Sequence, residues 1–197
     1  MIVLEGLPAL SPFRLERLEA RLRATVPQAR IAGAWFTYWV EPDAGATPEA
    51  RTLQRILQAD AGTRPRADGA VSRFVVPRLG TVSPWASKAT ELLHGAGLPV
   101  KRVERGTRID LLGWPGDAAS AAALSGLLHD PMTQSLLGDA AAAAAMFGTP
   151  ARGTVERIPL AALEAANTRL GLALADDEIE YLRTRYGELG ATRPTSS

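Results

Sequence analysis

The chain has 197 residues, 46% of them hydrophobic and 22% charged, which is the composition of a globular protein large enough to bury a core. Its 22 Lys and Arg against 21 Asp and Glu leave a net charge of +1, so no basic footprint indicates nucleic acid or an anionic membrane as a partner. The absence of cysteine excludes disulfides, thiol nucleophiles and thiolate metal sites. We therefore expect a cytoplasmic protein without a signal peptide or membrane span.

The amino-terminal residues predict the order strand, helix, strand, helix, strand. Ser11 is expected to cap the first helix and Pro12 to occupy its first position. The aromatic and β-branched run RIAGAWFTYWVEP is typical of a strand. The other segments are MIVLEG (strand), SPFRLERLEARLRATVP (helix), TPEARTLQRILQAD (helix with a Thr-Pro start) and VSRFVVPR (strand).

A second run of elements follows further along the chain, in the order helix, strand, strand, helix, strand. The stretch GTVSPWASKATELLHGAGL predicts a helix over about residues 84–95. Two strands, PVKRVERG and TRIDLLGW, are expected on either side of Gly106, followed by the helix DAASAAALSGLLHD and the strand PMTQSLL. We interpret residues 1–148 as an α+β domain of two tandem halves, each an antiparallel sheet covered on one face by helices.

After Gly148 the composition changes to the loop-like run TPARGTVERIP. Two helices are expected beyond it, the second opened by Asp176 and Asp177, whose charge suits a helix amino terminus. We predict a helical linker domain over residues 149–190 and a disordered tail over residues 191–197.

The lysine within the SPWASK run raises the question of a phosphate-binding loop. That loop needs Gly-x4-Gly-Lys-Ser/Thr, whereas Lys88 follows Ser87 and lies about one turn inside the predicted helix. The spacing therefore rejects a phosphate loop. The amides between Ser83 and Trp85 could still bind an anion, although Ser83 is expected to cap them.

Other catalytic patterns are absent or incomplete. His94 and His129 are the only histidines and lack HExxH spacing, and neither GxSxG nor GxGxxG occurs. Asp176 and Asp177 are better explained as capping charges than as an acid–base pair. The basic run 101–108 lacks stacking aromatics, which makes RNA binding a weaker alternative. We predict no catalytic, cofactor-binding or metal-ligating residue in this chain.

The run VPRLGTVSPWASKATELLHGAGL, followed by VKRVERG, resembles a segment of phosphoribosylformylglycinamidine synthase in its large single-chain form. Three other pieces are similar to that family in the expected order, so the resemblance spans almost the whole chain. One of them carries Gln134 where the family usually has an acidic residue. These pieces are LEGLPALSPFRLERLEARL, LLHDPMTQSLL and ANTRLGLALADDEIEYLRTRYGELG.

The resemblance implies the amino-terminal and linker parts of an enzyme of purine synthesis. That enzyme makes formylglycinamidine ribonucleotide from formylglycinamide ribonucleotide, ATP and glutamine. In the family this domain resembles a fused dimer of a small accessory subunit and packs against the synthetase and glutaminase parts. This chain departs from the family by stopping at GELGATRPTSS, before the synthetase motif, the ATP site and the glutaminase cysteine. ATP and magnesium are thus implied for the full enzyme only, and we predict that the chain alone is inactive.

Three hypotheses remain. The chain is a scaffold within the amidotransferase, a free-standing interaction module that acts in trans like the accessory subunit, or an unrelated ligand-binding protein with an anion site at Ser83–Trp85. The reading frame beyond Ser197 separates the first two. We predict an interface with the missing domains, and we also expect that the chain alone can self-associate. The candidate interface residues are Ser83, Trp85, Lys88 and Trp114.

Overall fold

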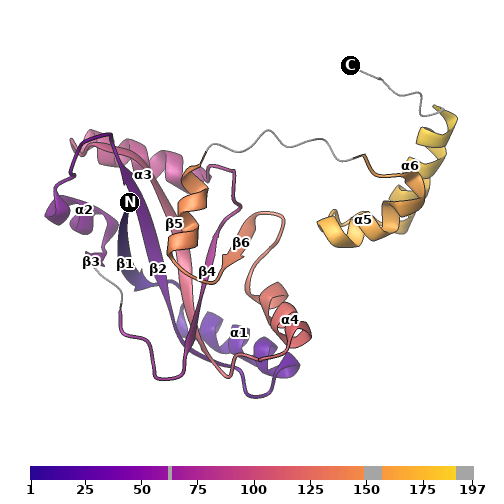
Figure 1. Cartoon of the computed structure of the whole chain (residues 1–197), viewed down its shortest axis with the longest axis horizontal. Coiled ribbons are helices and arrows are strands. Elements are labelled where there is room, and N and C mark those ends of the chain that lie inside the picture. Colours follow the sequence, from indigo (N-terminus) through magenta and orange to yellow (C-terminus); the bar gives the residue numbers. More distant parts are fainter. Residues whose placement is uncertain (62–63, 149–156, 190–197) are drawn as a thin grey trace. The chain divides into compact units, whose positions relative to one another are not determined.

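The computed structural model describes residues 1–61, 64–148 and 157–189. They belong to two compact units, Met1–Pro150 and Ala151–Ser197. The first unit is an α+β structure with one antiparallel sheet and helices (Figure 1). The predicted tail lies outside the described residues.

The sheet of the first unit has six strands in the order β3-β1-β2-β5-β4-β6. Its central pair, β2 and β5, is the longest, with Trp35 opposite Arg108 and Trp39 opposite Glu104. The two predicted halves therefore do not form separate sheets, because β2 and β5 join them into one. The strands are β1 (Ile2–Pro8), β2 (Arg30–Pro42), β3 (Asp60–Ala61), β4 (Val71–Pro77), β5 (Val100–Leu112) and β6 (Gln134–Leu137).

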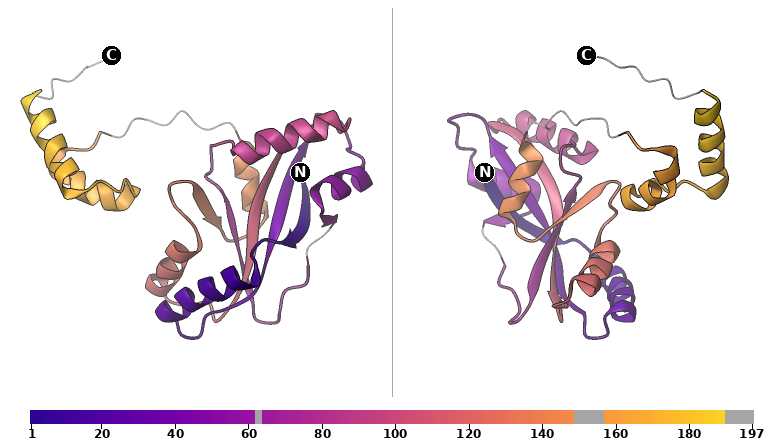
Figure 2. Two further views of the ribbon diagram at one scale, coloured as in Figure 1. Left: turned by 180° about the vertical axis from the view of Figure 1, so that it is seen from behind. Right: turned by 45° about the vertical axis from the view of Figure 1, so that its right-hand side comes forward.

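Four helices pack on one face of this sheet (Figure 2). α2 (Ala50–Leu57) and α3 (Pro84–Gly95) share one buried cluster with Tyr38 of β2. α1 (Pro12–Thr25) and α4 (Ala118–Leu128) share a second cluster with Ala34 of the same strand. Tyr38 and Ala34 are an even number of residues apart, so both clusters lie on the same face.

The opposite face is covered in part by a 3₁₀ helix, η1 (Ala141–Phe147), within the alanine-rich run. Trp39 is fully buried against this helix and donates its indole N–H to the carbonyl of Ala140 at 3.0 Å. The sequence did not predict η1, because alanine is small and apolar on every side and shows no helical periodicity.

Side-chain caps start the helices largely as the sequence predicts. The hydroxyls of Ser11 and Ser83 accept backbone N–H bonds at the starts of α1 and α3, and proline follows each cap. The prediction for α2 was wrong in detail, because this helix starts at Ala50 rather than at the Thr-Pro pair. Its N-cap is Glu49, whose carboxylate accepts two backbone N–H bonds, from Arg51 at 2.9 Å and Thr52 at 2.6 Å.

The prediction of two strands on either side of Gly106 was wrong. β5 continues through it for 13 residues. A Cβ atom there would lie 2.6 Å from the carbonyl oxygen of Val75 and 2.9 Å from the ring of Trp39. Glycine is required here because neighbouring atoms approach its backbone closely. A glycine inside a strand pattern can mark such a close approach as well as a break between strands.

The second unit contains the two predicted helices, α5 (Leu163–Leu170) and α6 (Asp176–Glu188), after a 3₁₀ turn, η2 (Leu160–Ala162). Asn167 closes the connection between α5 and α6: its amide donates to the carbonyl of Leu174 and its oxygen accepts from the N–H of Leu174, each at 2.9 Å. Ala166 and Ile179 are buried. Across the described ranges of both units, no helix has the length and apolar character needed to cross a membrane.

Candidate functional site

The start of α3 is held by a buried carboxylate. Glu104 of β5 is fully buried and accepts hydrogen bonds from the hydroxyl of Ser83 at 2.8 Å and from its backbone N–H at 3.3 Å. The Ser83 hydroxyl in turn accepts the N–H of Ala86 at 3.0 Å. An added anion at this helix start would meet the negative charge of Glu104, which argues against the anion site suggested at Ser83–Trp85.

Arg102 completes this arrangement. Its guanidinium pairs with Glu104 and donates to the carbonyls of Thr81 at 2.8 Å and Met146 at 2.9 Å. It also lies 5.2 Å from the centre of the Phe147 ring. The pair therefore joins β5, the loop before α3 and the end of η1.

A second buried charge cluster lies on the same sheet face. Arg108 is 1% exposed and binds Asp110 through two hydrogen bonds, at 2.8 and 2.6 Å, and Glu5 through one at 2.5 Å. Ser72 donates to Asp110 at 2.6 Å. Burial lowers the pKa of Arg108, but its bonds to Asp110 and Glu5 outweigh that effect and raise the pKa above its usual value. The sequence contained a signal for this cluster, because charges two residues apart in a strand share a face.

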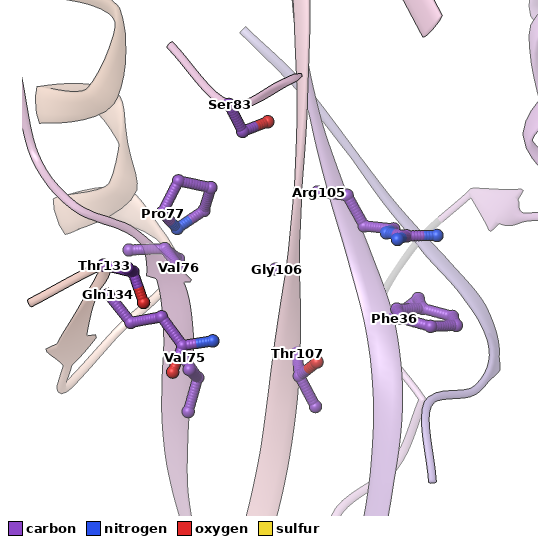
Figure 3. A pocket seen from close by; sticks show the side chains of 10 residues that line it. All are labelled: Phe36, Val75, Val76, Pro77, Ser83, Arg105, Gly106, Thr107, Thr133 and Gln134. Atoms are coloured by element: carbon purple, nitrogen blue, oxygen red, sulfur yellow. The ribbon is translucent and has the colours of Figure 1, made fainter. Parts of the chain in front are cut away.

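A polar hollow of about 320 Å³ lies near the end of the β4–β5 pairing (Figure 3). The last paired residues are Val75 and Thr107. Among the described residues that line the hollow, Arg105 is the only ionisable one. The hollow can thus offer hydrogen bonds and one positive charge, but its described lining holds no His, Asp or Glu to act as a general base for the hydroxyls of Ser83, Thr107 and Thr133. It is lined by Phe36, Val75, Val76, Pro77, Ser83, Arg105, Gly106, Thr107, Thr133 and Gln134.

A second hollow, of about 260 Å³, lies between α2 and α3 and shares Arg105 with the first. The Arg105 guanidinium lies 4.4 Å from the centre of the Phe36 ring and 4.7 Å from that of Trp85. Burial raises the pKa of Tyr38, while the positive charge and hydrogen bond of Arg105 oppose this shift. Arg105 is therefore the charged residue that the two hollows share, and the sequence did not single it out as a site residue.

The structure brings together three of the four predicted interface residues. Ser83, Trp85 and Lys88 lie at the start of α3 and line the two hollows. Trp114 lines neither of them, packs in the other helical cluster and has the guanidinium of Arg73 4.0 Å from its ring centre. Both tryptophans are half-buried. Their role in an interface remains a prediction.

The two histidines make local contacts to backbone carbonyls. His94 contacts the carbonyl of Val100 at 2.5 Å, and His129 contacts that of Ser125 at 2.8 Å. Within the described residues, no group of three or more His, Cys, Asp or Glu side chains could hold a metal ion.

These features define an α+β protein whose buried charges hold loops and strands, and whose helix-covered face carries hollows around one arginine. A family model for the amino-terminal region of formylglycinamide ribonucleotide amidotransferase matches residues 35–147, from within β2 to the end of η1. The match covers more than half of the chain, and the chain therefore belongs to this family. It confirms the resemblance found in the sequence and connects the chain with purine biosynthesis.

Proposed function

We propose that the chain is a non-catalytic scaffold that couples the glutaminase and synthetase parts of the amidotransferase. The family match over residues 35–147 carries this proposal. The buried charged groups support it, because they serve structure: Glu104 fixes the start of α3, and Arg108 of β5 binds Glu5 of β1 and Asp110 of its own strand.

The proposal includes an internal duplication, corresponding to two fused copies of a small subunit. Strand order and length support it. Outward from the central pair, β2, β1 and β3 have 13, 7 and 2 residues, and β5, β4 and β6 have 13, 7 and 4. In this proposal β4 opens the second half, whereas the sequence pattern had placed that strand at the end of the first. We assign α5 and α6 to the linker that leads to the synthetase part.

In this proposal ATP, magnesium and glutamine bind to the other parts of the enzyme, in the cytoplasm. The chain would contact those parts in cis, within one polypeptide, or in trans, as a separate one. Ser83, Trp85 and Lys88 are the described candidates for this contact, because they lie at the two hollows.

The test is to express this chain and the remainder of the amidotransferase as separate polypeptides. Formation of formylglycinamidine ribonucleotide is then measured with glutamine or with free ammonia as the nitrogen source. We expect the chain to increase the glutamine-dependent rate more than the ammonia-dependent rate, because coupling matters only when ammonia must travel between sites.

The control is the chain alone with glutamine, ATP and the ribonucleotide substrate. We expect neither ammonia release nor ATP consumption. Either activity in the purified chain would contradict a non-catalytic role. A remainder that works equally well with glutamine in the presence and absence of the chain would contradict the coupling role.

A further inference from the structure

Arg105 differs from its neighbours on β5 in lacking a carboxylate partner among the described residues. Arg102 and Arg108, on the other face of the strand, each pair with buried carboxylates. Arg105 is half-buried between the rings of Phe36 and Trp85, and no ion pair joins it to a described residue. A partly desolvated guanidinium without a counter-charge is well placed to bind an incoming anion.

The groove beside Arg105 is apolar at its rim. Ile56 of α2 and Leu92 of α3 line it and are 36% and 67% exposed. Lys88 adds a second positive charge, with Glu91 at 3.8 Å as its exposed partner. No carboxylate is among the described residues that line the groove. Apolar contacts beside two cations suit a peptide segment better than a free phosphate, which has no apolar part to bury.

We propose that the groove between α2 and α3 binds an acidic segment of the other amidotransferase domains. An Asp or Glu carboxylate of that segment lies against Arg105, and an adjacent apolar side chain packs between Ile56 and Leu92. The assignment rests on the proposed scaffold function and adds the chemistry of the partner. Positive charge and apolar surface lie on the same groove, and that combination selects an acidic segment with an apolar neighbour.

The lysine content of the chain permits a direct test of contact. Lys88 and Lys101 are its only lysines, and Lys101 pairs with Glu41 at 3.0 Å, away from the groove. A water-soluble carbodiimide joins a lysine amine to a nearby carboxylate as an amide and is itself converted to the urea. We expect Lys88, in the complex with the remaining enzyme, to be linked to an Asp or Glu of another domain. Links from Lys88 to its own chain alone, such as to Glu91, would overturn the proposal.

Binding measurements test the same contact without cross-linking. The R105Q substitution removes the charge and should weaken binding to the remaining enzyme by about tenfold or more, and should reduce the salt dependence of binding. K101Q is the matched control, since it also removes a positive charge from β5 but Lys101 lines neither the groove nor the polar hollow. It should bind as wild type does. L92S tests the apolar contact at a side chain exposed enough to leave the fold intact.

The outcomes separate the two proposals. If wild type binds tightly and neither R105Q nor L92S weakens binding, the proposal that the groove is the binding site is overturned, and the proposed scaffold function is not. No binding by wild type would overturn the scaffold function and, with it, the partner assigned to the groove.

Discussion

Individual ion pairs in the first unit differ mainly in their burial. The Glu104 side chain is 0% exposed and its partner Arg102 is 18% exposed, whereas Lys101 and Glu41 are 64% and 28% exposed. A buried charge that loses its partner stays desolvated, whereas an exposed one is hydrated by water. The two pairs lie in the same region of β5 and should therefore contribute very differently to stability.

The substitution E104Q should lower the free energy of unfolding by about 3 kcal/mol, because it leaves the guanidinium of Arg102 without its counter-charge. The matched substitution E41Q should cost about 0–1 kcal/mol. Urea unfolding of both variants, followed by tryptophan fluorescence, measures the difference. Equal losses in the two variants would show that Glu104 acts only as an ordinary hydrogen-bond acceptor.

At the same scale, the sequence indicated Trp85 and Lys88 as candidate interface residues but could not indicate Arg105. Phe36 and Trp85, which enclose Arg105, come from β2 and α3, and only the folded sheet brings them together. The sequence around Arg105 was interpreted as a basic cluster without aromatic residues, because Phe36 and Trp85 lie far from it in the sequence. Contacts of this kind depend on strand order, which local patterns do not specify.

At the scale of elements, the helix starts depend on single side chains. Asp117 caps α4 by accepting the N–H of Ser120 at 2.8 Å, and this hydrogen bond lowers the pKa of its carboxyl. An ionised carboxyl with a lowered pKa stabilises the fold fully above its ordinary pKa of 3.8. That contribution is lost as the pH falls through the lower pKa of the folded state.

The D117N variant keeps a capping oxygen but cannot ionise. Its stability should therefore fall less than that of wild type as the pH is lowered from about 6 to about 2, since one acid-sensitive contribution has been removed. Urea unfolding at a series of pH values measures how the free energy of unfolding changes with pH in each protein. The other carboxyl groups are the same in both proteins. Identical slopes would contradict a folded-state shift at Asp117.

The elements themselves could be predicted better than their boundaries and pairing. Ser-Pro pairs gave the starts of α1 and α3 because serine and proline act within one turn of the helix. The same pattern gave a wrong start for α2 at Thr47–Pro48, because the carboxylate of Glu49 accepts the free backbone N–H groups instead. Gly106 was misread because its requirement comes from Val75 and Trp39 on neighbouring strands.

At the scale of the whole molecule, the two compact units have cores of different size. The first contains three buried clusters and all four tryptophans: Trp35, Trp39, Trp85 and Trp114. Among the described residues of the second, the buried apolar side chains are Ala166 and Ile179. Because stability rises with buried apolar area, the second unit should be the less stable one.

We therefore expect two transitions in urea. Circular dichroism at 222 nm reports helices of both units and should begin to change at lower urea than tryptophan fluorescence, which reports the first unit alone. The I179A substitution should shift the early part of the circular dichroism change and leave the fluorescence transition unchanged. Coincident curves in the wild-type protein would mean that the units unfold as one.

The pairing of β2 with β5 also has a consequence during synthesis on the ribosome. Residues 30–42 are made long before residues 100–112, with which they pair across almost their whole length. Translation at about 5–20 residues per second would leave β2 with one unpaired edge for several seconds. An exposed strand edge of this length can pair with other chains. Newly made protein should therefore be most prone to aggregation in the interval before β5 emerges, and chaperones that shield nascent chains would act on β2.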